Sequence, residues 1–359
     1  MQTADPPAGS RLDRLRALMG EEGLAALLVS DHTNVRWLTG FSGSAGQVYV
    51  PLEGEAVLVT DGRYTERAAE EAPGWTIITD RTWGWLGQHH PATSPLAVEA
   101  DHLTWTVVQE LTQLAVCSQM QPSSGLVAGL RQVKDDGELA LLRRACELTA
   151  ETFELAVGWL RPGLTEVQVA RRLVADMIDL GAEGQAFPPI VAAGPNGARP
   201  HHDPGARPLA AGDMITMDFG ALVGGYHADM TRTVGLGAVD PMLAGIHDLV
   251  HRAQEAGVRA AVAGTQTAAV DRACRQLISA AGHGQHFEHG TGHGVGLGLH
   301  ETPFMAASST GTLRDRMTIT VEPGVYVPGL GGVRIEDVVL VGSDGAQRLT
   351  TAPRHLLKL

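Results

Sequence analysis

The stretch ITMDFG at residues 215–220, followed by YHADMTRTV at residues 226–234, decides the fold of the C-terminal half. Alternation along the first run places Thr216 and Asp218 on one face of a strand and the apolar residues on the other. Glycines lie between the two runs, and a tight connection there would pair the strands that carry Asp218 and Asp229. The pattern therefore predicts a β-sheet with acidic residues directed toward one face.

An acid beside a polar residue recurs twice further along the chain. In the run ending at Glu322 the acid shares its face with Thr320, and in the run ending at Glu336 it shares its face with Arg334. Such a neighbour can hold a metal ligand in place. Asp337 falls on the opposite face from Glu336, so we exclude it as a ligand.

These acids form a set that implies a buried positive charge. A carboxylate is rarely buried unless something neutralises it, and four of them lie amid apolar residues here. Two divalent cations would supply four positive charges, and a histidine in the glycine-rich run HGTGHGVGLGLHE would complete the ligation. The predicted dinuclear metal site consists of Asp218, Asp229, His293, Glu322 and Glu336.

The ligand types indicate both the metal and the chemistry. Taken singly, each acid would more simply be a strand-end residue or an ion-pair partner, but the shared phase, flanks and polar neighbours favour a site. Oxygen-rich ligation with one imidazole suits Mn, with Co or Zn also compatible. Two ions about 3.5 Å apart can clamp a water, lower its pKa and polarise a carbonyl, which predicts hydrolysis.

Several histidines lie near the predicted ligands. His289 and His293 have the spacing of the two histidines of a zincin helix, but the glycines between and after them disfavour a helix. The glycines instead predict a loop in which the main chain closely approaches a ligand or metal. In the pair His201-His202, one member is expected to be a plain loop histidine. Two further histidines are assigned no role: His283 and His286.

Length, charge and cysteines bound the class of protein. A chain of 359 residues suits two domains better than one, and a net charge of −13 disfavours nucleic acid or an anionic membrane as partner. The three cysteines are far apart with no CxxC, which is typical of reduced residues in a cytoplasmic protein. We expect no signal peptide in MQTADPPAGS and no transmembrane helix.

The segment pattern predicts an α/β fold with two domains, at residues 1–125 and 126–359. Residues 11–116 alternate helix-like and strand-like segments, and residues 118–125 have the composition of a linker. The strand candidates of the smaller N-terminal α/β domain are Ala25–Val29, Val48–Val50 and Ala56–Thr60.

The C-terminal domain contains two predicted helix pairs. Asp135 or Asp136 can cap the first helix and Thr165 the second. Residues 241–262 and 267–281 predict the second pair. Each pair precedes strand-rich sequence, which favours a pseudo-symmetric α/β half-shell. We interpret two tyrosines near the predicted ligands as structural: Tyr226 and Tyr326.

Taken together, these motifs resemble the pita-bread metallopeptidases, and more narrowly the proline-specific branch that contains aminopeptidase P and prolidase. All five ligand positions match, and the motifs PHH, DMTRT, HGTGHGVGL, LHE, EPGVY and RIED lie around them; the N-terminal part matches through NVRWLTGFSGSAG and TDGRYTERA. The resemblance implies a pita-bread (creatinase/aminopeptidase) C-terminal domain, a creatinase-like N-terminal domain and a homodimer.

The resemblance also implies a role for each matching residue. Asp229 and Glu336 would bridge the two metals, Asp218 would bind the second, and His293 and Glu322 the first; Glu322 would also act as general base and then acid. The accessory histidines and the arginine behind the ligands match His201, His289, His300 and Arg334. The doubled histidine leaves open whether His201 or His202 is the active-site residue.

The implied reaction is cleavage of a peptide bond before proline. A metal-bridging hydroxide would attack the carbonyl carbon, and the free amine of the substrate near Asp218 would make the enzyme an exopeptidase. Proline's nitrogen has no N–H, so enzymes that grip this group cannot process the bond.

Alternatives differ in the length of the substrate or in chemistry. Aminopeptidase P accepts longer peptides, whereas prolidase takes dipeptides and must hold their terminal carboxylate. Phe304 stands where dipeptidases of the family often have an arginine, and GFSGSAG…DGRY is more similar to aminopeptidase P, so we predict an Xaa-Pro aminopeptidase, with Xaa-Pro dipeptidase the alternative. The intact ligand set opposes a non-catalytic binding protein and creatinase-like C–N hydrolysis, and methionine aminopeptidase would not need residues 1–117.

Overall fold

The computed structural model describes residues 10–114 and 116–359, and the chain forms two compact units. The first unit ends at Arg131 and the second begins at Gln132. Each unit is described by itself below.

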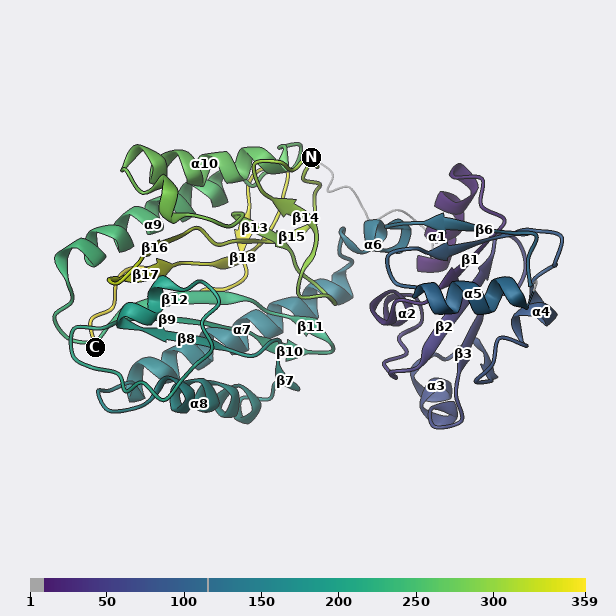
Figure 1. Cartoon of the computed structure of the whole chain (residues 1–359), viewed down its shortest axis with the longest axis horizontal. Helices are drawn as coiled ribbons and strands as arrows, with labels where there is room; N and C mark the ends of the chain where they lie inside the picture. Colours follow the sequence, from purple (N-terminus) through teal and green to yellow (C-terminus); the bar gives the residue numbers. More distant parts are fainter. Residues whose placement is uncertain (1–9, 115) are drawn as a thin grey trace. The chain divides into compact units, whose positions relative to one another are not determined.

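The N-terminal unit is built around a sheet flanked by helices (Figure 1). The sheet has six strands in the order β4-β3-β2-β1-β5-β6. Strand β2 runs antiparallel to β1 and β3, and the other neighbouring pairs are parallel. The strands are β1 (Ala26–Val29), β2 (Gly46–Pro51), β3 (Val57–Thr60), β4 (Thr76–Thr79), β5 (Pro95–Glu99) and β6 (Gln119–Ser123). The helices are α1 (Arg11–Glu21), α2 (His32–Thr39), α3 (Thr65–Glu71), α4 (Leu86–His89), α5 (Trp105–Gln113) and α6 (Leu126–Arg131). The three strand candidates of the sequence are thus confirmed as β1, β2 and β3.

The prediction of a linker at residues 118–125 is wrong. Residues Gln119–Ser123 form β6, which pairs in parallel with β5 at the edge of the sheet. Its serines and Pro122 resemble linker composition, but an edge strand tolerates proline because one side of its main chain needs no partner.

The C-terminal unit has two helix pairs on opposite sides of its strands, as Figure 1 shows. They are α7 (Asp136–Trp159) with α8 (Glu166–Asp179), and α9 (Pro241–Ala260) with α10 (Thr267–Ala280). This is the predicted arrangement of two pairs, and short 3-10 turns lie at η1 (Gly194–Ala198) and η2 (Gly284–His286). Within residues 10–114 and 116–359, no helix combines the length and apolar character needed to cross a membrane.

The predicted helix starts are confirmed by their capping contacts. The Asp135 side chain accepts the N–H of Glu138, and the Glu138 side chain accepts the N–H of Asp135. Thr165 forms the same capping box with Gln168. Asp240 caps α9, where Pro241 occupies the first turn. Local sequence thus determines where these helices begin.

The strands of this unit form several small sheets that surround the acidic residues. The orders are β12-β9-β8, β14-β13-β15-β18-β19, β11-β10-β7 and β16-β17. The bounds are β7 (Gly184–Gln185), β8 (Ile190–Ala193), β9 (Met214–Phe219), β10 (Ala221–Val223), β11 (Tyr226–His227), β12 (Met230–Gly235), β13 (Gly292–Gly294), β14 (Glu301–Met305), β15 (Thr318–Val321), β16 (Gly324–Val327), β17 (Gly331–Arg334), β18 (Asp337–Leu340) and β19 (Gln347–Arg348).

The two strands quoted first pair as predicted, but their connection is longer than a tight turn. Strands β9 and β12 are antiparallel, with Thr231 directly opposite Asp218. Between them β10 and β11 form a hairpin that turns at Gly224 and Gly225, both with positive φ. This hairpin places Asp229 immediately before β12.

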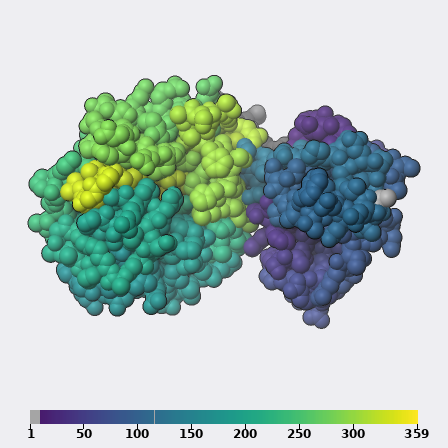
Figure 2. Space-filling model, in the orientation of Figure 1, coloured from purple at the N-terminus to yellow at the C-terminus, as the bar shows by residue number. Residues whose placement is uncertain are grey.

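The C-terminal segment completes the unit beside β12. Gly235 donates to the carbonyl of Leu357 and accepts from the N–H of Leu359. Figure 2 shows this yellow segment at the surface, between the green surface of the α9 and α10 region and the teal surface of earlier residues.

Candidate metal centre

All five predicted ligands line one cavity of about 420 Å³ in the C-terminal unit. Each side chain lies in a strand or directly beside one. Asp218 is in β9, Asp229 precedes β12, His293 is in β13, Glu322 follows β15 and Glu336 lies between β17 and β18.

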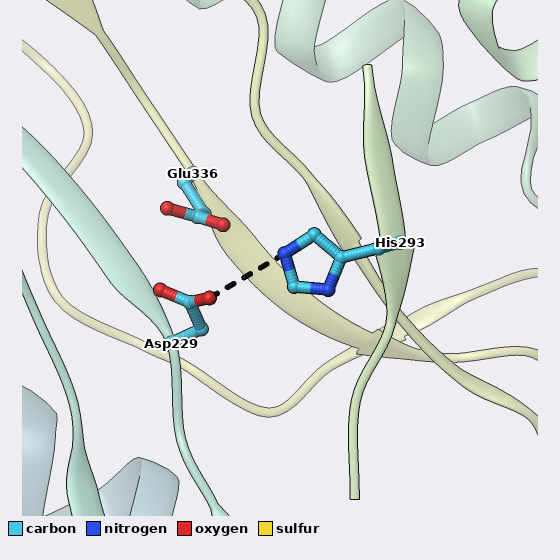
Figure 3. A group of neighbouring side chains, drawn as sticks. All are labelled: Asp229, His293 and Glu336. Atoms are coloured by element: carbon cyan, nitrogen blue, oxygen red, sulfur yellow. Dashed lines mark ion pairs between the residues drawn. The ribbon is translucent and has the colours of Figure 1, made fainter. Parts of the chain in front are cut away.

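Three of these residues form a compact group of metal-ligating atoms. One ligand atom each of Asp229, His293 and Glu336 lies within 4.8 Å of the other two, and all three residues are buried. Figure 3 shows the three side chains pointing toward one another, with the dashed line joining Asp229 Oδ2 and His293 Nε2, which are 3.6 Å apart. Carboxylate oxygens and an imidazole nitrogen at this spacing suit a first-row divalent cation.

The other two predicted ligands border this group. Glu322 Oε1 lies 3.5 Å from His293 Nε2 and accepts the hydroxyl of Thr320 at 3.2 Å, the neighbour that alternation predicted. Asp218 Oδ2 accepts from Arg334 at 2.7 Å. Its Oδ1 is buried and has no hydrogen-bond partner within the described part of the chain. An unsatisfied buried carboxylate oxygen beside three other acids fits a cation ligand.

The raised pKa values of the clustered acids also favour binding of a cation. Burial raises the pKa of Asp229, and the neighbouring carboxylates of Glu336, Asp218 and Glu322 raise it further. Burial likewise raises the pKa of Glu336 and of Glu322. The residues therefore fit divalent metal: bound positive charge would let these acids ionise together.

A hydrogen-bond network behind the acids orients them. The Thr231 hydroxyl donates to Glu336 Oε2 at 2.6 Å and accepts from Arg334 Nε at 3.0 Å. Arg334 also donates to Asp218 and to the hydroxyl of Tyr326. One buried guanidinium thus connects two of the predicted ligands.

Glycine is required beside His293 by close main-chain approach. A Cβ on Gly292 would lie 2.0 Å from the Thr320 carbonyl oxygen, and one on Gly294 would lie 2.5 Å from that of Thr302. The expected loop is therefore corrected: His293 occupies the short strand β13, between β14 and β15. The close approach at these glycines is to main-chain carbonyls of neighbouring strands. The predicted approach to a ligand or metal stays a prediction.

The accessory histidines all line the same cavity. The His300 ring packs edge-on against His293, with centroids 4.4 Å apart. His289 bonds Tyr326 at 2.8 Å through Nε2 and lies 4.0 Å from Glu322. His201 borders the cavity, whereas His202 bonds the buried carboxylate of Glu166 at 2.9 Å.

Tyr326 is not among the residues that line the cavity but contacts two that are, which fits the structural role interpreted from the sequence; sequence reasoning did not predict these two contacts. Its hydroxyl lies between His289 and Arg334, at 2.8 Å from each, and burial raises its pKa to about 12, so it stays a donor. Tyr326 is an even number of residues after Glu322, but Pro323-Gly324 interrupts the strand, so alternation did not indicate a shared face. Asp337, excluded earlier, points elsewhere and pairs with Arg232 at 2.6 Å.

The fold and the site define a two-unit α/β protein with a buried group of carboxylates and an imidazole that could hold metal. Two family models cover nearly the whole chain: the metallopeptidase family M24 at residues 140–343, and the creatinase/prolidase N-terminal domain at residues 11–133. The chain belongs to metallopeptidase family M24, and it is a metallopeptidase with the divalent-metal dependence of that family.

Proteins of known sequence or structure are similar over their full length. The uncharacterized peptidase YqhT of Bacillus subtilis is 34% identical, over 97% of this chain and 100% of its own. An Xaa-Pro dipeptidase structure from Bacillus anthracis has a TM-score of 0.92 at 35% identity, covering 97% and 99% of the two chains. An X-Pro aminopeptidase structure from Thermotoga maritima has a TM-score of 0.90 at 31% identity, covering 98% and 100%.

Proposed function

We propose that this metallopeptidase is an Xaa-Pro aminopeptidase, an exopeptidase that removes the N-terminal residue from peptides whose second residue is proline. The family assignment supplies the metallopeptidase chemistry. The proline preference is supported by the family resemblance of the motifs and by the similar structures, which are of an Xaa-Pro dipeptidase and an X-Pro aminopeptidase.

The observation that favours longer peptides over dipeptides is the charge of the cavity lining. A dipeptide places its terminal carboxylate inside the cavity, where it needs a cation. Arg334 is the one arginine or lysine among the described residues that line the cavity. It already donates to Asp218, Thr231 and Tyr326, and to the Pro200 carbonyl at 3.3 Å. Much of the remaining wall is apolar: Phe187, Ile190, Leu299, Phe304 and Ala306.

We assign the five acid and histidine side chains to two divalent ions, Mn in the first place and Co or Zn as alternatives. Asp229 and Glu336 would be shared by both ions, Asp218 would hold one, and His293 and Glu322 the other. When bound, the ions would lower the pKa of a water and polarise the carbonyl before proline.

The residues of the chain would handle the substrate and the proton. Glu322 would take the proton of the attacking water and deliver it to the proline nitrogen, which has no N–H of its own. His201 and His300 border the cavity and would donate to the substrate carbonyl, while His289, beside Glu322, would stabilise the tetrahedral intermediate. The substrate amine would lie near Asp218. Arg334 would hold Asp218 and Thr231 in place.

Xaa-Pro dipeptidase is the second candidate. It is favoured by the similar Bacillus anthracis structure, which is described as an Xaa-Pro dipeptidase at 35% identity. The two candidates differ only in whether a free carboxylate directly after proline is accepted.

A peptide-length series separates the two. We would purify the protein with Mn, measure its metal content, and compare kcat/KM for an Xaa-Pro dipeptide, the matched Xaa-Pro-Yaa tripeptide and the N-acetylated tripeptide. The proposal expects tripeptide turnover to exceed dipeptide turnover and the acetylated peptide to be inert. Activity confined to the dipeptide would establish the second candidate, and loss of activity in Asp229→Asn and Glu336→Gln would locate the reaction at this centre.

Homodimerisation and a cytoplasmic location stay predictions. The first comes from the family resemblance and the second from the separated cysteines, whose thiols are free in the structure. Light scattering of the purified protein tests the first.

A further inference from the structure

One arginine on α10 binds the segment that carries His289. Arg275 Nη1 donates to the Phe287 carbonyl at 2.8 Å, and its Nη2 donates to the His289 carbonyl at 2.7 Å. Its guanidinium also lies over the Phe287 ring, 4.1 Å from the centroid. A planar, forked donor is suited to two carbonyls two residues apart, whereas a lysine offers a single point of charge.

The arginine is itself held by a buried acid. Asp271, one turn earlier on α10, accepts from Arg275 Nε and Nη2 through its two oxygens at 2.9 and 2.8 Å, and it is 1% exposed. Asp271 also accepts the Thr291 hydroxyl at 2.8 Å, and the Thr291 carbonyl accepts the N–H of Glu322 at 2.8 Å. The pair therefore binds the chain on both sides of His289.

Phe287 connects the arginine to the His289 imidazole by direct ring contact. Its ring is 2% exposed and packs edge-to-face against His289, with centroids 5.1 Å apart. The imidazole also contacts Tyr326, whose hydroxyl bonds Nε2. The His289 ring is thus held by an aromatic ring and by a hydroxyl, and neither Arg275 nor Phe287 lines the cavity.

We propose that Arg275 and Phe287 are positioning residues for His289, and that α10 thereby sets the geometry of catalysis without touching the substrate. This inference rests on the proposed function, because it assigns His289 to the Xaa-Pro reaction. It goes beyond that function in linking turnover to an ion pair on a helix outside the cavity.

The test uses conservative variants with matched controls in the full, Mn-loaded enzyme. Arg275→Lys keeps the charge but not the fork, and the control Arg272→Lys changes an exposed arginine on the same helix. Phe287→Leu keeps an apolar side chain but not the ring, and the control Phe153→Leu changes an equally buried phenylalanine on α7. Each variant is assayed for metal content, thermal unfolding and kcat and KM on the Xaa-Pro-Yaa tripeptide.

Displacement of a catalytic group by a fraction of an ångström lowers turnover more than binding. We expect Arg275→Lys and Phe287→Leu to lower kcat by about 10-fold or more, with KM within about threefold and metal content unchanged. The controls should keep kcat within about twofold, even where Phe153→Leu unfolds at a lower temperature.

A double-mutant cycle with His289→Ala completes the test. If the two residues act through His289, Arg275→Lys should add little to the loss caused by His289→Ala alone. An active wild-type enzyme in which the losses multiply, or in which Arg275→Lys and Phe287→Leu behave like their controls, would overturn the positioning role. A metal-loaded wild-type enzyme that cleaves no Xaa-Pro peptide would instead overturn the proposed function, and the inference with it.

Discussion

At the scale of single residues, Phe304 is the side chain on which the proposed preference for longer peptides most directly depends. It lies in β14 directly opposite His293, lines the cavity and is 49% exposed. Residues opposite one another on antiparallel strands share a face, so Phe304 lies on the same side of β13 and β14 as a predicted metal ligand. An apolar ring there gives a substrate carboxylate nothing to bind.

Replacing this ring by a cation should shift the enzyme toward dipeptides. In Phe304→Arg, the guanidinium would bond the carboxylate of an Xaa-Pro dipeptide, an interaction of about 1.5–3 kcal/mol. We expect the ratio of dipeptide to tripeptide kcat/KM to rise by about 10-fold or more. Phe304→Leu is the control, because it replaces the ring by a smaller apolar side chain without adding charge. An equal rise in Phe304→Leu would attribute the effect to space and not to charge.

At the scale of elements, the loop between β13 and β14 depends on a buried ion pair. Lys134, which precedes α7, is 1% exposed, and its Nζ lies 3.1 Å from Glu301 Oε2 at the start of β14. Glu301 Oε1 accepts the N–H of Gly298 at 2.7 Å. This loop carries His300, so we infer that the Lys134–Glu301 ion pair fixes the position of the His300 imidazole.

Breaking the pair should cost stability, and replacing both partners should separate stability from activity. Lys134→Met removes the cation beside the buried Glu301 carboxylate, which should lower the free energy of urea unfolding by about 3–5 kcal/mol. The double variant Lys134→Met/Glu301→Leu should recover most of that stability. It should not recover kcat/KM, because Gly298 has lost its acceptor and the His300 loop is no longer held. Full recovery of activity together with stability would mean that the pair serves the fold alone.

The elements also show what sequence could and could not predict. Helix starts can be predicted from the sequence because capping contacts are local: Asp135 and Thr165 accept main-chain N–H groups within one turn. Ligand-bearing strands were readable because alternation is local as well. By contrast, β6 exists only through pairing with β5, and Tyr326 reaches His289 only after β16 folds back beside the site. Contacts between distant segments leave no pattern in a single run of residues.

At the scale of the whole molecule, one buried histidine makes the free energy of unfolding depend on pH. His247 on α9 is 3% exposed, and burial lowers its pKa to about 4. Its pKa in the unfolded chain is about 6.5, so the unfolded state binds a proton that the folded state excludes between these values. Its contribution to stability is therefore present above about pH 6.5 and is lost as pH falls toward 4.

This predicts a distinct acid sensitivity that one substitution removes. Between pH 6.5 and pH 4, His247 should account for about 3 kcal/mol of lost stability. His247→Gln should lack that component, so the difference in urea unfolding free energy between the wild type and the variant should shrink as pH falls. A difference that stays constant across this range would show that the folded His247 takes up a proton as readily as the unfolded one.

The acid cluster should give the opposite trend, and metal should cancel it. The folded-state pKa values of Asp229, Glu322 and Glu336 are raised, so the folded state without metal holds protons that the unfolded state has released. In EDTA, this cluster therefore destabilises the fold increasingly as pH rises above about 4, the unfolded-state pKa of these acids.

Bound divalent metal needs the same acids ionised, so protons compete with the metal and its affinity rises with pH. The stabilisation by Mn, measured as the difference in unfolding free energy with and without EDTA, should grow from pH 5 to pH 8 and reach about 2.7 kcal/mol at 100 times Kd. The same difference in Asp229→Asn/Glu336→Gln should be small and flat. An increment in the wild type that is independent of pH would mean that Mn binds somewhere other than this cluster of buried carboxylates.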